Sequence, residues 1–107
     1  MKDGIYFVKF KSSIQDFGEG VVVVNKGIIN GADFGFTYKG RTSNNKAIIE
    51  IFQHDLEVES VFGDIKSFQI ELVISDVSGG YLLKGGIKDT PNIEIIVEAK
   101  YVGDLLA

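Results

Sequence analysis

The chain has 107 residues, 45% of them hydrophobic and 24% charged, which indicates one globular domain with a single core over residues 1–107. It contains no cysteine, so disulfides, thiolate nucleophiles and thiolate metal sites are excluded. The net charge is −4 and the Lys and Arg residues are scattered, which disfavours direct nucleic-acid binding.

The start of the chain, MKDGIY, is not followed by an uninterrupted apolar segment, so we expect no signal peptide. No apolar run approaches the roughly 20 residues of a membrane span. Together with the lack of cysteine, which is typical of a reducing compartment, these features predict a cytoplasmic protein that does not act at a membrane.

The first alternating run covers residues 4–11 and predicts a strand, followed by a loop over 12–18. Four consecutive valines, Val21 to Val24, then favour a strand because β-branched side chains are stiff at χ1. Asn25-Lys26-Gly27 supplies a tight hairpin turn, in which Gly27 can take a positive φ.

The next run begins at Ile28, and Asn30-Gly31 is interpreted as a second turn. Phe34, Phe36 and Tyr38 then alternate with small or polar residues, which predicts a strand with one aromatic face. The stretch from Gly20 to Gly40 therefore predicts an antiparallel meander with no room for a helix.

The second half of the chain predicts four more strands. Polar or glycine-containing turns are expected at Arg41–Asn45, Ser78–Gly80 and Asp89–Asn92. Gly85-Gly86 is interpreted as a bend or bulge at a barrel corner. The strands are expected over Lys46–Gln53, Phe68–Ser75, Tyr81–Lys88 and Ile93–Tyr101.

Residues 54–66 have the least clear pattern, with an edge strand and a helical turn at Ser60–Gly63 as the two interpretations. No segment of ten residues shows apolar spacing of helical period, so the fold is expected to be all-β with at most one short helix. About eight short strands favour a barrel or a two-sheet sandwich. We prefer an eight-stranded antiparallel barrel, because closure removes exposed strand edges.

His54 is the single histidine, and Asp55 next to it belongs to the opposite face of a strand, which is typical of a solvated surface histidine. The sequence contains no triad, zinc set or phosphate-binding loop. Gly18-Glu19-Gly20 precedes a strand and not a helix, so it does not predict a phosphate cradle. We therefore expect no enzymatic activity, no catalytic residue, no metal and no cofactor.

Asp55, Glu57 and Glu59 have the spacing that places three carboxylates on one strand face. A solvated edge is the ordinary interpretation of such a pattern, and a patch that binds a protein partner is the functional one. Calcium requires six to eight oxygen ligands, and no nearby residues complete such a shell.

The aromatic residues expected on inward strand faces fill a core or line a cavity for a small hydrophobic ligand, since an eight-stranded barrel is just wide enough for either. The candidate cavity-lining residues are Tyr6, Phe36, Tyr38, Phe68 and Tyr101.

Phe7 and Ile96 are expected to face outward on the first and last strands, which become neighbours if the barrel closes. Exposed apolar residues that gather in one patch are typical of an interface. Phe7 and Ile96 are therefore candidates for the seam of a homodimer.

Several short motifs give the chain a resemblance to the GrlR-like family, small bacterial proteins typified by a negative regulator of type III secretion. The motifs follow one another in order and extend over nearly the whole chain. They are MKDGIY at Met1–Tyr6, GEG at Gly18–Gly20, NGADFGFTYKG at Asn30–Gly40 and SVFG at Ser60–Gly63.

The resemblance implies a lipocalin-like eight-stranded barrel with a short helix, often dimeric, that represses a helix-turn-helix transcriptional activator by binding it. An acidic EDED run of the family's founding member matches Ser43–Lys46 here, where no acid is present. Our hypothesis places the acidic docking patch at Asp55, Glu57 and Glu59 instead. The leading interpretation is a non-enzymatic protein-binding regulator, and the alternative is a carrier or sensor of a small hydrophobic ligand.

Overall fold

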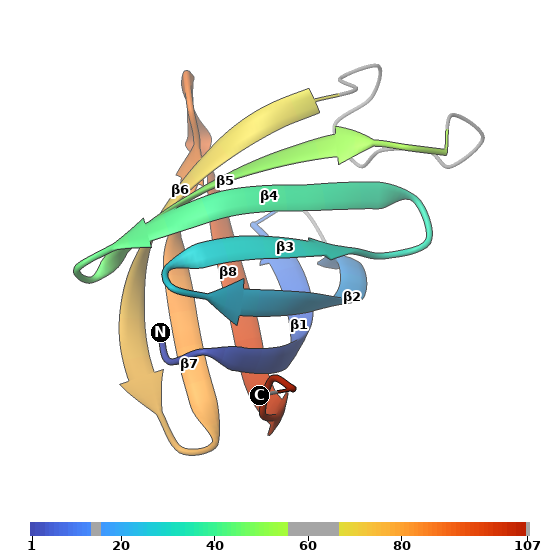
Figure 1. Ribbon diagram of the computed structural model, residues 1–107. Coiled ribbons are helices and arrows are strands. Elements are labelled where there is room, and N and C mark those ends of the chain that lie inside the picture. The colour runs from blue at the N-terminus through green and yellow to red at the C-terminus, as the bar shows by residue number, and fades with distance from the viewer. Residues whose placement is uncertain (14–15, 56–66, 107) are drawn as a thin grey trace.

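Alternating inward and outward side chains organise the chain into eight antiparallel strands that close into a barrel (Figure 1). The computed structural model describes residues 1–13, 16–55 and 67–106, and within these residues there is no helix. The all-β eight-stranded barrel expected from the sequence is therefore confirmed. The strands are β1 Gly4–Ser12, β2 Asp16–Asn25, β3 Ile28–Ala32, β4 Phe36–Ser43, β5 Lys46–Gln53, β6 Ser67–Val77, β7 Gly80–Ile87 and β8 Thr90–Gly103.

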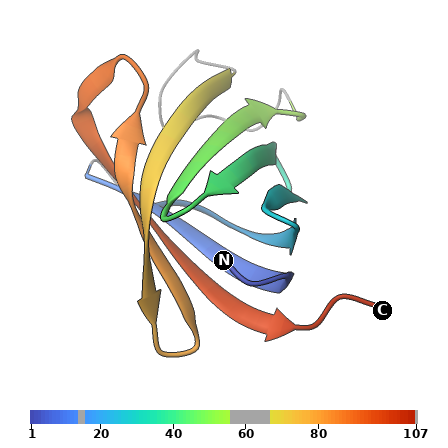
Figure 2. The ribbon, with the colours of Figure 1, turned by 60° about the vertical axis from the view of Figure 1, so that its left-hand side comes forward.

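The barrel closes through the first and last strands, which lie side by side (Figure 2). Their pairing runs from Ile5 opposite Gly103 to Ser12 opposite Ile95, with a bulge after Ile5. All remaining pairs of neighbouring strands in the barrel are also consecutive in the sequence. Because neighbouring strands in the barrel are antiparallel and consecutive in sequence, the meander closes without a crossover connection, and the longest link is residues 54–66 between β5 and β6.

Buried aliphatic and aromatic side chains from all eight strands form the core. No polar or charged residue among those described is buried, so the core is held together mainly by the burial of apolar surface. The largest fully buried side chains are Tyr6, Val24, Ile51, Ile70, Leu83, Ile95 and Val97.

Two inward glycines mark places where neighbouring strands approach closely. A Cβ at Gly31 would lie 2.6 Å from Cγ1 and 2.7 Å from Cα of Val22, and one at Gly85 would overlap the carbonyl oxygen of Glu71. The register between β7 and β8 shifts just after Gly86. An irregularity therefore lies directly beside the predicted Gly85-Gly86, but its additional residues are on β8, because the partner moves from Glu94 to Thr90 between Gly86 and Ile87.

The turn predicted at Asn30-Gly31 is wrong, because both residues belong to β3 and Gly31 pairs with Val22 and Tyr38. The chain turns three residues later, where the carboxylate of Asp33 accepts hydrogen bonds from the backbone N–H groups of Gly35 and Phe36. A short side chain that bonds its own backbone outweighs the Asn-Gly turn signal here. The predicted aromatic run therefore loses its first member, because Phe34 lies in this turn.

The remaining corrections concern strand ends. The expected loop over 12–18 is shorter, because β2 begins at Asp16, and the turn after β4 is limited to Asn44-Asn45. The turn expected at Asp89–Asn92 lies earlier, at Lys88-Asp89, and Pro91 belongs to β8. Pro91 is tolerated because the pairing of β1 with β8 begins only at Ile95, which leaves this part of β8 at an edge.

The tight turn between β2 and β3 is confirmed, since Lys26 and Gly27 both have positive φ, 53° and 79°. This pair of positive values is typical of the two-residue hairpin turn whose twist matches that of the strands. The edge strand and the helical turn considered for residues 54–66 fall almost entirely outside the described residues. The described ranges contain no helix long and apolar enough to cross a membrane.

Candidate functional site

The two residues predicted to form a dimer seam, Phe7 and Ile96, lie on adjacent strands but do not form one patch. Phe7 pairs with Lys100 and Ile96 pairs with Lys11, and Lys9 opposite Glu98 separates the two pairs. Both side chains are half-buried. The expected adjacency of β1 and β8 is therefore confirmed, whereas the apolar neighbours of Phe7 lie on β2.

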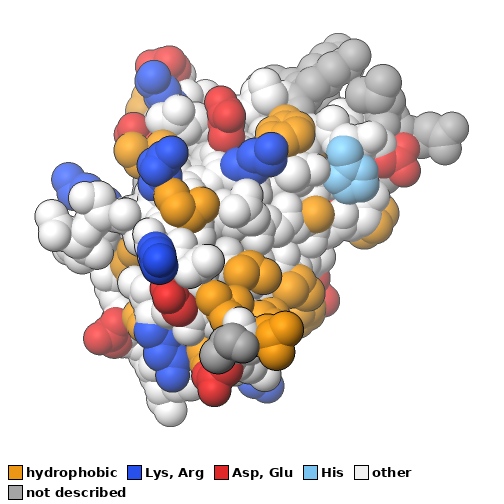
Figure 3. All heavy atoms as spheres, in the orientation of Figure 1, with side chains coloured by type: hydrophobic (Ala, Val, Ile, Leu, Met, Phe, Trp, Pro, Cys, Tyr) orange, Lys and Arg blue, Asp and Glu red, His pale blue; other side chains and the backbone are white. Residues whose placement is uncertain are grey.

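An apolar surface runs over the outer side of β1 and β2, where hydrophobic side chains gather in Figure 3. Val21 lies opposite Phe7 and Val23 lies opposite Ile5, so the four side chains form a rectangle. Val21 is 48% exposed, and Val102, in the β8 bulge beside Ile5, is 54% exposed. We call this surface the β1–β2 face and define it by Ile5, Phe7, Val21, Val23 and Val102.

The run of four valines carries the sequence signal for the β1–β2 face, although alternation alone does not identify the face as a patch. Successive side chains of a strand point to opposite sides, so two of four consecutive strand valines must face outward. Val22 and Val24 are buried in the core, which leaves Val21 and Val23 on the outside. The outward valine pair beside the outward Phe7 therefore forms an apolar surface across two strands.

Charged residues border the β1–β2 face at one end. Lys9 pairs with Glu19 on β2 and with Glu98 on β8, and Lys11 Nζ lies 3.1 Å from Glu98 Oε1. Ion pairs this exposed contribute little to stability. Lys9, Glu19, Lys11 and Glu98 therefore form a charged border at one end of the apolar surface.

The five candidate cavity-lining residues contribute to the core but lie in different groups. Tyr6 and Tyr38 are almost completely buried, whereas Phe36, Phe68 and Tyr101 are half-buried against the core. The Tyr6 ring packs edge-on against Tyr101 at a centroid distance of 5.5 Å. Tyr38 instead packs against Phe10 at 4.7 Å. The five residues therefore do not form one common cluster.

The Tyr6 end of the barrel is covered by the first residues of the chain. The Tyr6 hydroxyl donates to the carbonyl oxygen of Lys2 at 2.6 Å, and the Lys2 N–H donates to the Tyr81 hydroxyl at 3.0 Å. The Lys2 ammonium lies 3.9 Å from the centre of the Tyr101 ring. The Lys26 N–H donates to Asp3 at 2.8 Å, so this segment is attached at several points.

Burial raises the pKa of Tyr6 to about 12, with smaller contributions from Tyr81 and Asp3. A tyrosine in the unfolded chain has a pKa near 10. At a pH between 10 and 12 the Tyr6 hydroxyl stays protonated in the folded protein but is ionised in the unfolded chain. The free energy of unfolding therefore falls as the pH rises.

We therefore expect the free energy of unfolding to decrease by at most about 2 kcal/mol between pH 10 and pH 12 through Tyr6 alone. Urea titrations across this range measure the decrease. The Tyr6→Phe variant, which has no phenol to titrate at this position, is expected to show a shallower decrease. Equal slopes in the two proteins would contradict the role assigned to Tyr6.

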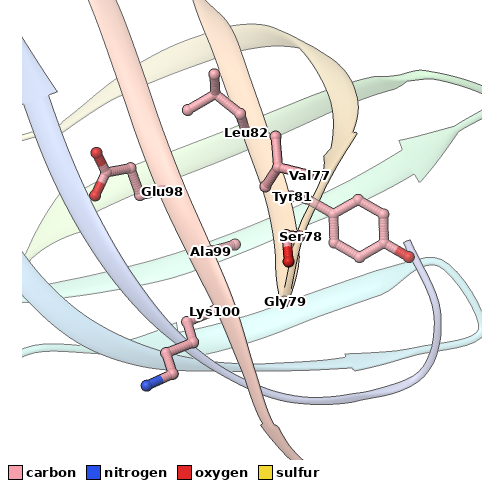
Figure 4. Close-up of a pocket in the computed structure, with 8 residues that line it drawn as sticks. All are labelled: Val77, Ser78, Gly79, Tyr81, Leu82, Glu98, Ala99 and Lys100. Atoms are coloured by element: carbon pink, nitrogen blue, oxygen red, sulfur yellow. The ribbon is translucent and has the colours of Figure 1, made fainter.

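Two open hollows flank the turn between β6 and β7. One, of about 410 Å³, lies against β8, where Glu98 and Lys100 point to one side while Tyr81 points to the other (Figure 4). The second, of about 430 Å³, includes Lys2, Asp76 and Tyr101. In the second hollow, the Lys2 ammonium already contacts the Tyr101 ring, and the Tyr101 hydroxyl donates to Asp104. These two side chains are therefore already engaged within the protein.

The single histidine, pale blue in Figure 3, is exposed as expected, and its Nε2 lies 2.9 Å from the carbonyl oxygen of Asp33. Asp55 is half-buried beside the same turn, where its N–H donates to Gly35. Glu57 and Glu59 lie outside the described residues. Within the residues described, no cluster of three or more His, Cys, Asp or Glu side chains forms a metal site.

Comparison with known proteins gives no assignment of family, because no family model matches the chain and no curated protein matches it significantly.

Proposed function

We propose that this barrel is a non-enzymatic regulatory protein that works by binding other proteins at its outer surface. The observation that carries the proposal is the β1–β2 face, an exposed apolar surface next to the seam where β1 pairs with β8. Exposure of apolar side chains to water is unfavourable. A patch of such side chains is therefore typical of a surface that is covered when a complex forms. The buried aromatic and aliphatic side chains of the described strands pack against one another, which supports an outer functional surface.

The geometry of the β1–β2 face fits a second copy of the chain. If a two-fold axis lies between β1 and β2 and parallel to them, Phe7 of each copy faces Val21 of the other, and Ile5 faces Val23. The same axis places Lys9 opposite Glu19 of the other copy. Apolar groups then meet apolar groups at the centre, and opposite charges meet at the rim.

The further partner follows from the resemblance to the GrlR-like family. We propose that the dimer binds a transcriptional activator in the cytoplasm and represses it. Asp55, Glu57 and Glu59 are the acidic residues proposed to contact this partner. The alternative is a barrel that carries a small hydrophobic molecule among Tyr6, Phe36, Tyr38, Phe68 and Tyr101.

Native mass spectrometry of the purified protein tests this proposal. We expect a dimer without a bound small molecule, and a monomer for the Val21→Lys variant, because a buried unpaired charge opposes association. Ile48→Lys is the matched control, since Ile48 is 49% exposed on β5, away from the face.

A monomeric wild-type protein, or equal dissociation by both variants, would contradict pairing through the β1–β2 face. A stoichiometric hydrophobic adduct would favour the carrier function instead.

A further inference from the structure

The turn between β3 and β4 presents a phenylalanine to solvent. Phe34 is 78% exposed, and it is the one aromatic side chain among the large exposed hydrophobic residues in the described part of the chain. Leaving a side chain of this size in water forgoes roughly 2 kcal/mol of burial free energy. An exposed phenylalanine on a turn that is held in one conformation therefore indicates a binding function.

The carboxylate of Asp33 fixes the turn from within. Its Oδ1 accepts the N–H groups of Gly35 at 2.8 Å and Phe36 at 2.7 Å, and its Oδ2 accepts the hydroxyl of Tyr38. The Asp33 N–H also donates to the carbonyl oxygen of Phe36 at 3.0 Å. Since Tyr38 is buried, this network ties the turn directly to the core.

The segment after β5 fixes the turn from the other side. The backbone N–H groups of His54 and Asp55 both donate to the carbonyl oxygen of Gly35, at 2.9 and 3.2 Å. The His54 ring lies within hydrogen-bond distance of the Asp33 carbonyl oxygen, at 2.9 Å. Gly35 is buried by these contacts, whereas its neighbour Phe34 remains outside.

We infer that Phe34 is a preorganised anchor that inserts into an apolar pocket on a protein partner. This inference rests on the proposed protein-binding function and names the residue that contacts the partner. A side chain held in its binding position before contact loses little conformational entropy on binding. A buried aromatic anchor surrounded by a polar rim is the usual form of a binding hot spot.

The charges around Phe34 favour a protein with a basic rim to its pocket. The carboxylate of Asp33 lies in this turn, the backbone of Asp55 bonds to the turn, and the whole chain carries a net charge of −4. An anionic membrane surface repels such a site, and one ring gives little insertion energy. A partner that offers an apolar pocket with Lys or Arg at its rim complements both features.

Site-specific photo-crosslinking tests the inference. p-Benzoylphenylalanine is placed at position 34 in one protein and at position 48 in a control, and each is irradiated in lysate of the source organism. We expect a protein adduct from position 34 that position 48 does not give. Excess unlabelled wild-type protein should suppress this adduct, and unlabelled Phe34→Ser protein should be at least about tenfold less effective.

Phe34→Ser is expected to fold as the wild type does, because the side chain is exposed, and its thermal unfolding verifies this. Equal competition by the two unlabelled proteins, or no adduct specific to position 34, overturns the inference. An adduct only with the protein itself also overturns it, because the occupant is then a second copy. The dimer mass of Phe34→Ser distinguishes failure of the anchor from failure of pairing through the β1–β2 face.

Discussion

The Gly85→Ala variant is expected to lose about 3 kcal/mol of unfolding free energy. The added Cβ would overlap the carbonyl oxygen of Glu71 and lie 2.8 Å from its carbonyl carbon and 2.9 Å from Cα of Leu72. These are backbone atoms of β6, so no side-chain rotation relieves the overlap, and strands β6 and β7 must separate locally. Forcing atoms into a packed interior typically costs about 1 to 3 kcal/mol or more.

Urea unfolding followed by far-ultraviolet circular dichroism measures this effect. Gly103→Ala is the matched control, because a Cβ at Gly103 has no neighbour within 4 Å. The control is expected to unfold within about 0.5 kcal/mol of the wild type. If Gly85→Ala were equally mild, the close approach of β6 and β7 at this residue would be incorrect.

The Tyr38→Ala variant is expected to lose about 4 kcal/mol, because it removes a large buried ring. That ring contacts Phe10 and lies where Gly20 leaves room for it, since a Cβ at Gly20 would be 3.1 Å from Cε2 of Tyr38. Tyr38→Phe keeps the ring and removes only the hydroxyl that bonds Asp33. A hydrogen bond to a charged group contributes about 1.5 to 3 kcal/mol, which sets the expected loss for Tyr38→Phe.

Comparison of Tyr38→Phe with Tyr38→Ala distinguishes two roles of Tyr38. One is the packing of its ring in the core, and the other is the effect of its hydroxyl on the position of Phe34. Tyr38→Phe is expected to keep the barrel folded while loosening the Asp33 turn, so crosslinking from position 34 should weaken. Denaturant unfolding and the photo-crosslinking yield are the two measurements. Equal stability losses in the phenylalanine and alanine variants would mean that the ring itself contributes little.

Much of the fold is predictable because its signals are local. Alternation placed β5 at Lys46–Gln53 without error, and Lys26-Gly27 provided the turn chemistry for the hairpin of β2 and β3. The irregularity beside Gly85-Gly86 was also predictable, because a glycine inside an apolar strand often marks a bulge or a close approach of two backbones. Closure was predicted from the number of strands and from the short turns that join most of them.

The missed features depend on contacts between distant residues. Asn30-Gly31 has the composition of a turn, but pairing with Val22 and Tyr38 keeps it extended. Phe34 belongs to an alternating aromatic pattern, and only the hydrogen bonds of Asp33 place it in a turn. The β1–β2 face likewise requires the register between two strands, which alternation within one strand does not reveal.

The closing pair of strands makes this barrel equivalent to a ring of hairpins. Because β1 and β8 are antiparallel neighbours, a short linker from the end of β8 to the start of β1 would form an eighth hairpin like the other seven. The chain could then be opened at the Ser78-Gly79 turn, where an added Cβ on Gly79 meets nothing within 4 Å. Circular permutation of this kind would preserve every strand pair, so the order of the strands along the polypeptide is not what defines the architecture.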